Sequence, residues 1–136
     1  MQKIRHTSPD VREPEAGMWS NCLSVGEFIF ISGLTARGTD GSTILGSDSY
    51  EQSGVIFRKM RALVEAAGAA MDDVVQMTIF VTDMSENAQV WRARREFFTG
   101  DFPTCALVEV AALAKDEIRV EVQATAVRGS STAPAA

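Results

Sequence analysis

Five strand-like runs, interrupted by two helix-like segments, restrict the fold of this chain more than any other feature of its sequence. The runs are apolar, rich in β-branched and aromatic residues, and bounded by glycines or polar turns, which is typical of strands. They cover Trp19–Ser24, Phe28–Gly33, Val74–Val81, Leu107–Ala112 and Ile118–Val127. In the last run apolar and polar residues alternate, so one side of that strand is expected to be buried.

The two helix-like segments each begin with a capping pattern. Asp48 and Glu51 are spaced as in a capping box, and apolar residues then recur at helical spacing, which predicts a helix over residues 48–67. The same spacing recurs at Asp83 and Glu86, which predicts a second helix over residues 83–98. A glycine follows each segment closely and acts as a stop signal.

The resulting order is ββαβαββ, which predicts an α+β fold with one mixed sheet and both helices on one face. We expect a single domain over residues 1–136, with an extended N-terminal arm at 1–17 and a flexible tail at 129–136. The second face of the sheet is only partly polar, and such faces are often buried between subunits. The sequence therefore predicts a homo-oligomer.

Composition and charge disfavour several classes of function. The formal net charge of −5 would repel a phosphate backbone, and the cluster Arg92, Arg94 and Arg95 is expected to be a solvated helix face. Two cysteines and one histidine cannot readily form a zinc site, so we expect no metal and no cofactor. No signal peptide or membrane-spanning run is recognisable, which favours a cytoplasmic protein without a membrane partner.

Several short motifs, in a fixed order along residues 17–127, carry a resemblance to a known family. They are Ser32-Gly33, Val64–Gly68, Phe80–Asp83, Phe102-Pro103, Val108–Ala111, Leu113–Asp116 and Val120–Val122. With them the chain resembles the RidA (YjgF-like, reactive intermediate deaminase) family. The resemblance implies a chorismate-mutase-like fold, a homotrimer with clefts between subunits, and cofactor-free hydrolysis of enamines and imines to keto acids and ammonia. Some members have also been called endoribonucleases or translation inhibitors.

The resemblance implies a set of cleft residues, at several of which this chain departs from the deaminase pattern. In the deaminases an arginine two positions after the Phe-Pro pair holds the substrate carboxylate, whereas this chain has Cys105 there. The resemblance places Trp19 at a cleft tyrosine, Trp91 at an asparagine and Leu107 at a cysteine, whereas Ser32, Gly33 and Glu121 match. A thiol cannot replace the bidentate grip of a guanidinium on a carboxylate.

The roles of these residues remain open at the level of sequence. In the family, the acid at Glu121 would orient or protonate the water that attacks the imine carbon; alternatively, it is an ordinary carboxylate paired with Arg119. Cys105 could be a nucleophile, or it could only pack or line the cleft. Arg119 could instead supply a substitute cation. The two tryptophans could either widen an apolar site or fill it.

Three functions therefore compete. The first is a Rid-type hydrolase that deaminates an enamine, imine or related metabolite between subunits, with its substrate shifted away from small amino-acid-derived imines. The second is a non-catalytic member that binds or senses a small molecule. The third is an endoribonuclease or translation inhibitor, which the acidic charge disfavours.

Overall fold

A computed structural model describes residues 1–132 of the chain. Its strands are β1 (Lys3–Arg5), β2 (Cys22–Val25), β3 (Phe28–Leu34), β4 (Val74–Val81), β5 (Thr104–Glu109) and β6 (Val120–Val127). Its helices are α1 (Ser49–Ala66) and α2 (Asn87–Arg95), with short 3₁₀ turns at Met71–Asp73 and Met84–Glu86. The strands form one sheet in the order β1-β2-β3-β6-β4-β5, in which only β4 and β5 are parallel.

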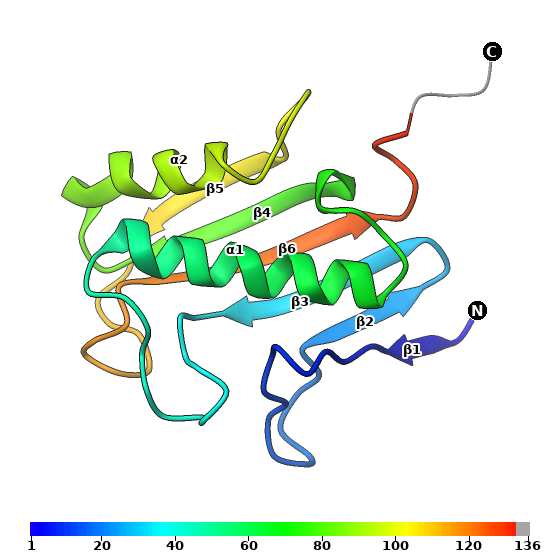
Figure 1. The fold of residues 1–136 in the computed structure, drawn as a ribbon, viewed down its shortest axis with the longest axis horizontal. Helices are drawn as coiled ribbons and strands as arrows, with labels where there is room; N and C mark the ends of the chain where they lie inside the picture. The colour runs from blue at the N-terminus through cyan, green and yellow to red at the C-terminus, as the bar shows by residue number, and fades with distance from the viewer. Residues whose placement is uncertain (133–136) are drawn as a thin grey trace.

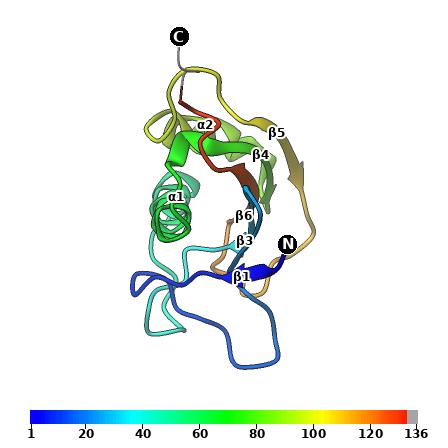
Figure 2. The ribbon, with the colours of Figure 1, turned by 90° about the vertical axis from the view of Figure 1, so that its right-hand side faces the viewer.

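Both helices cover the same face of this sheet (Figure 1). Figure 2 shows the sheet from its edge, with α1 and α2 on one side and no helix on the other. In β6 the residues Val120, Val122 and Ala124 point toward the helices and are buried, as the alternating pattern predicted. The predicted α+β class, the mixed sheet and the placement of both helices are confirmed.

The strand limits differ from the sequence prediction where a partner strand sets them. β5 begins at Thr104 rather than Leu107 because it pairs with β4 from Gln76 onward, and it ends at Glu109. β2 begins at Cys22 rather than Trp19. Trp19 is 54% exposed, and its indole nitrogen donates a hydrogen bond to the Asn21 side chain. The start of β5 is therefore set by a distant strand, whereas β2 begins where its hairpin pairing with β3 begins, at Cys22 and Ile31.

The first half of the predicted capping box at Asp48 forms and the second half does not, whereas at Asp83 neither half forms. Asp48 accepts a hydrogen bond from the backbone of Glu51 at 2.8 Å, but the Glu51 carboxylate reaches the backbone of Ser47 instead of Asp48. Asp83 caps only a 3₁₀ turn, and α2 then runs over Asn87–Arg95, shorter than predicted. The Glu86 carboxylate is directed to Ser49 and Arg119, which links α2 to other elements.

Both ends of the described chain contain ordered segments. The strand β1, around Ile4, pairs with β2, so part of the predicted N-terminal arm belongs to the sheet. The backbone groups of Gly129 and Ser131 donate to the Asp73 carboxylate at 3.1 and 2.8 Å, so the predicted tail is anchored at its start. Its remaining part, residues 133–136, lies outside the described residues. Within residues 1–132, neither helix combines the length and the apolar character needed to cross a membrane.

Candidate active site

The structure divides the predicted site residues into two groups. The first surrounds a cavity of about 670 Å³, here called the Glu121 cavity. Trp19, Gly33 and Glu121 line it, together with the basic residues Arg12, Arg37 and Lys59. Trp91, Cys105 and Leu107 form the second group, on α2 and β5. Sequence reasoning named members of both groups but missed the cations of the first.

Glu121 lies on the open face of the sheet, since it alternates with residues of β6 that are buried under the helices. Its carboxylate is packed against the backbone of Gly33, where an added Cβ would lie 2.9 Å from Oε2. The absence of a side chain at Gly33 lets the carboxylate pack this closely, and a larger residue there would displace the carboxylate from this position.

The Glu121 carboxylate is half-buried and forms no ion pair or hydrogen bond with any other residue in the described range 1–132. Burial raises the pKa of Glu121 because the charged form loses hydration. Arg119, the alternative partner, instead donates to Glu86 at 2.8 Å. An uncompensated carboxyl group with a raised pKa is suited to accepting and returning a proton.

Ser32 is held by the protein rather than presented to the cavity. Its hydroxyl donates to the carbonyl of Ser20 at 2.6 Å, and its backbone nitrogen donates to the carbonyl of Asn21 at 3.0 Å. The hydroxyl proton that we expected to be donated to a ligand is thus already donated to the carbonyl of Ser20. The Ser32 oxygen retains only its capacity to accept hydrogen bonds.

Lys59 is a half-buried cation at the Glu121 cavity. Its ammonium group donates to the carbonyls of Thr35 and Arg37 at 2.8 and 3.1 Å. Burial lowers the pKa of Lys59 to about 8, with a smaller contribution from the charge of Arg37. A sequence signal was present, because Lys59 lies three residues after Ile56 and four before Leu63, on the apolar face of α1.

The second group lies between α2 and the edge strand β5. Cys105 and Leu107 pair in register with Met77 and Ile79, whose side chains are buried beneath the helices, so both point to the helical face. The guanidinium of Arg94 lies over the ring of Trp91, with 4.6 Å between Cζ and the ring centroid. It also lies 5.5 Å from the centroid of Phe102.

Cys105 has the properties of a lining residue rather than a nucleophile. Partial burial raises the pKa of the thiol and outweighs the opposite effect of the nearby Arg94 guanidinium. The one histidine, His6, contacts Ser24 on β2 through Nε2 at 2.7 Å, and β2 is four strands away from β5 in the sheet order. His6 is therefore too far from Cys105 to act as the base that forms a thiolate.

The expectation that Arg92, Arg94 and Arg95 form a solvated helix face holds for only part of the cluster. Arg92 lies over the ring of Tyr50, with 3.9 Å between Cζ and the centroid. Nε and Nη1 of Arg94 are buried, whereas Arg95 is exposed. Arg92 and Arg95 are thus exposed as expected, whereas the rings of Trp91 and Phe102 shield Arg94, and charge count alone could not reveal this.

One chain does not bring the two groups together. Glu121 faces the open side of the sheet, whereas Cys105 and Leu107 face the helical side, on a strand separated from β6 by β4. A cleft containing both groups therefore needs residues from a second copy of the chain.

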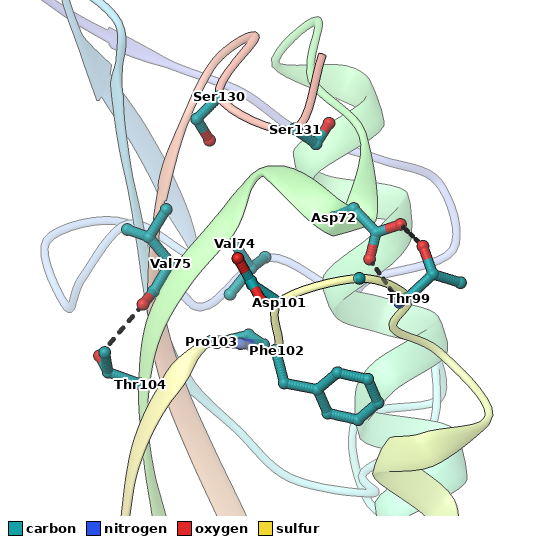
Figure 3. Close-up of a pocket in the computed structure, with 11 residues that line it drawn as sticks. Asp72, Val74, Val75, Thr99, Asp101, Phe102, Pro103, Thr104, Ser130 and Ser131 are labelled. Carbon is teal, nitrogen blue, oxygen red and sulfur yellow. Dashed lines mark hydrogen bonds between the residues drawn. The ribbon is translucent and has the colours of Figure 1, made fainter. Parts of the chain in front are cut away.

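A second cavity, of about 470 Å³, lies at the opposite end of β4 (Figure 3). Asp72, Thr99, Asp101 and Ser131 are among its lining residues. Both oxygens of the Asp72 carboxylate accept hydrogen bonds from Thr99, as the dashed lines in Figure 3 show. None of the predicted site residues lines this cavity, so we do not assign the function to it.

The fold and the half-buried carboxylate together define an α+β protein with helices on one sheet face and an acid at the exposed one. The sequence profile of the endoribonuclease L-PSP family matches residues 11–128. The chain belongs to this family, which is the RidA family of the resemblance described above. The family identity predicted from the motifs is thus confirmed.

Individual relatives agree with this assignment. A 2-iminobutanoate/2-iminopropanoate deaminase of Dermatophagoides farinae is 31% identical over 127 residues, covering 93% of this chain and 98% of the relative. The crystal structure of a Pseudomonas aeruginosa protein of unknown function is 32% identical, with a TM-score of 0.83 and 94% of each chain covered. The structure of Escherichia coli TdcF with bound serine is 25% identical, with a TM-score of 0.83, covering 93% of this chain and 99% of TdcF.

Proposed function

We propose that this protein is a Rid-type hydrolase that deaminates an enamine or imine in a cleft between subunits, with Glu121 as the catalytic carboxylate. The observation that carries the proposal is the half-buried, unpaired carboxylate of Glu121 packed on Gly33, in a chain of this family. Relatives named as imine deaminases support the reaction class. The location expected for this activity is the reducing cytoplasm, in keeping with the free thiols of Cys22 and Cys105.

The proposed reaction needs one group that moves a proton twice. Glu121 accepts a proton from water as the water oxygen bonds to the imine carbon, and the C=N bond becomes a single bond. Glu121 returns this proton to the nitrogen, which gives a carbinolamine. It then carries the hydroxyl proton of the carbinolamine to the nitrogen, the C–N bond breaks as the C=O bond forms, and ammonia leaves a keto product. A carboxyl group whose pKa is raised by burial can serve in both steps.

A homotrimer would complete the site. Phe28 and Phe30 are stacked on each other on the open face of the sheet and are 52% and 48% exposed, an apolar surface suited to a subunit interface. Such packing would let one chain supply Glu121 and its neighbour supply Trp91, Cys105 and Leu107. The division of the predicted residues into two groups supports this arrangement.

The substrate would differ from small amino-acid-derived imines. Trp19 and Trp91 add flat apolar surface at two cleft positions, which favours a bulkier substrate side chain. Cys105 occupies the position at which the family resemblance places the carboxylate-binding arginine, so a small imine would lose its usual anchor. The same substitution favours the second candidate, a non-catalytic binding protein, in which a ligand would bind without turnover.

Turnover assays separate these candidates. We would generate 2-aminoacrylate and the bulkier imines of phenylalanine and leucine in situ, and follow the release of ammonia and keto acid. We expect acceleration with the bulkier imines, and a loss of at least about 100-fold in Glu121→Gln because the proton carrier is removed. The matched control is Glu117→Gln, an exposed carboxylate near β6. Acceleration that survives Glu121→Gln, or none with any imine, would contradict the proposal.

A further inference from the structure

The guanidinium of Arg94 is half-buried and only partly satisfied by the described chain, in which its one recorded polar neighbour is the Cys105 thiol, whose pKa it lowers. Its Nε and Nη1 atoms are both buried and have no hydrogen-bond partner within residues 1–132. Leaving charged donors without acceptors away from water costs several kcal/mol, and such groups in native proteins usually await an ion, a ligand or a partner. The free chain therefore holds a cation prepared for an anion that is not part of it.

The rings around Arg94 do not satisfy its N–H groups. Trp91 and Phe102 contact the guanidinium with ring centroids 4.6 and 5.5 Å from Cζ. Cation–π contact stabilises the charge through the face of the guanidinium, whereas its N–H donors point outward in its plane. The remaining requirement is an acceptor in that plane, and a carboxylate matches it in a bidentate manner.

The carboxylates of the elements packed around α2 have other partners. Glu86 pairs with Arg119, and Glu96 accepts the hydroxyl proton of Tyr50 at 2.6 Å. Glu109 accepts the backbone N–H of Met84 at 2.8 Å. No ion pair to Arg94 occurs among the described residues. An intramolecular salt bridge therefore does not explain this half-buried charge.

The cations of the Glu121 cavity are, by contrast, already bonded to the protein. Lys59 donates to two carbonyls, Arg37 donates to the carbonyl of Gly41 at 3.0 Å, and Arg12 donates to that of Thr39 at 3.2 Å. These bonds anchor loops and leave fewer donors for a ligand. Arg94 is thus the better-prepared anion site of the two regions.

The position of Arg94 relates it to the proposed cleft. Arg94 follows Trp91 by about one turn of α2 and lies close enough to Cys105 to act on the pKa of its thiol. We propose that Arg94 binds the carboxylate of the substrate from helix α2, which would make the substrate a 2-imino acid with a bulky side chain. This inference rests on the proposed function, and it moves the anion anchor from strand β5 to the neighbouring helix.

The test compares Arg94→Met with Arg95→Met, a variant of the adjacent exposed arginine. Substrates are the imine of phenylalanine and the imine of phenylalanine amide, which lacks the carboxylate. We expect Arg94→Met to raise KM for the acid by about 10- to 100-fold and to leave the amide unaffected, because only the acid loses a charge-assisted hydrogen bond. Arg95→Met should change neither. Arg94→Lys should retain only part of the affinity, because lysine keeps the positive charge but lacks the two coplanar N–H donors of a guanidinium.

A binding measurement keeps this inference separate from the proposed function. Titration of phenylpyruvate, the keto-acid product, into the wild-type protein and into Arg94→Met measures carboxylate binding without turnover. Binding that depends on Arg94 in a protein without imine hydrolysis would sustain this inference and refute the enzyme. Turnover that depends on Glu121, with binding and KM insensitive to Arg94→Met, would overturn this inference alone.

The remaining alternative is that a neighbouring copy satisfies Arg94. Arg94→Met would then change the oligomeric state, which light scattering after size exclusion would detect, and that result would also overturn the inference. Thermal unfolding of each variant verifies that it is folded. Should Arg94→Met fail to fold, Arg94→Lys carries the same comparison between the acid and the amide.

Discussion

At the scale of the residue, two half-buried ionisable groups show how partial burial shifts the pKa of an acid upward and that of a base downward. Burial raises the pKa of Glu121 and lowers the pKa of Lys59 to about 8, because both lose hydration in their charged forms. Lys59 recovers hydrogen bonds from two carbonyls, whereas Glu121 recovers none within residues 1–132. Glu121 is therefore the group whose charge the fold compensates least.

The pH dependence of the stability of the protein should reflect the uncompensated charge of Glu121. Its pKa is higher in the folded state than in the unfolded chain, so the folded state binds the proton more tightly and loses stability as pH rises through the two values. Glu121→Gln removes this loss. We expect its melting temperature to exceed that of the wild type at pH 7.5, with the gap narrowing at pH 4. A pH-independent gap, or a less stable variant at pH 7.5, would argue against an uncompensated carboxylate.

At the scale of the element, one buried amide joins α1 to the start of β6. Gln52 is 1% exposed, and its Nε2 donates to the carbonyls of Gly46 and Glu117 at 3.1 and 2.8 Å. Its Oε1 accepts the backbone N–H of Arg119 at 2.8 Å. These bonds fix the segment that leads into β6 two residues before Glu121. Through Gln52, the helix therefore positions the strand that carries Glu121.

Replacing this amide by an apolar residue of similar size should be costly. Gln52→Leu leaves three backbone groups without partners, and we expect a loss of about 3 kcal/mol in the free energy of unfolding. Urea denaturation at fixed protein concentration measures it. Gln76→Leu, at an exposed position of β4, is the control and should change stability by less than about 0.5 kcal/mol. Equal effects of the two substitutions would show that the three bonds contribute little.

The same scale shows what local sequence patterns could predict. The order of elements, the limits of α1 and β4, and the burial of alternate residues in β6 follow from periodicity and capping, which are encoded within a few neighbouring residues. The start of β5, the partial burial of Lys59 and the ring contacts of Arg94 depend on Gln76, Thr35 and Phe102, which lie elsewhere in the chain. Those features required the tertiary structure.

At the scale of the whole molecule, the site is divided between the two faces of one sheet. Family motifs named Glu121 and Cys105 as members of one cleft, but the register places them on opposite faces. No sequence pattern within one chain could show that division. Association of copies through the open sheet face would resolve it, since that face exposes Phe28 and Phe30.

A charge placed on the apolar surface formed by Phe28 and Phe30 should abolish both assembly and activity. Phe30→Lys places a charge in the middle of the exposed aromatic pair, and we expect a trimer to dissociate to monomers in light scattering at micromolar concentration, with loss of imine hydrolysis. Leu45→Lys, at a loop residue 44% exposed, is the matched control and should stay assembled. A monomeric wild type, or a Phe30→Lys variant that remains assembled, would contradict the shared-cleft arrangement.

The hydrogen bonds that Asp73 accepts from the backbone of Gly129 and Ser131 have a practical consequence for anyone who modifies this protein. The carboxylate also accepts a hydrogen bond from the backbone N–H of Ala70. It therefore connects the turn before β4 to the residues that follow β6. An affinity handle or a fusion partner belongs beyond Thr132. Truncation after Arg128 would remove the hydrogen bonds from Gly129 and Ser131 to the Asp73 carboxylate, which directly precedes β4.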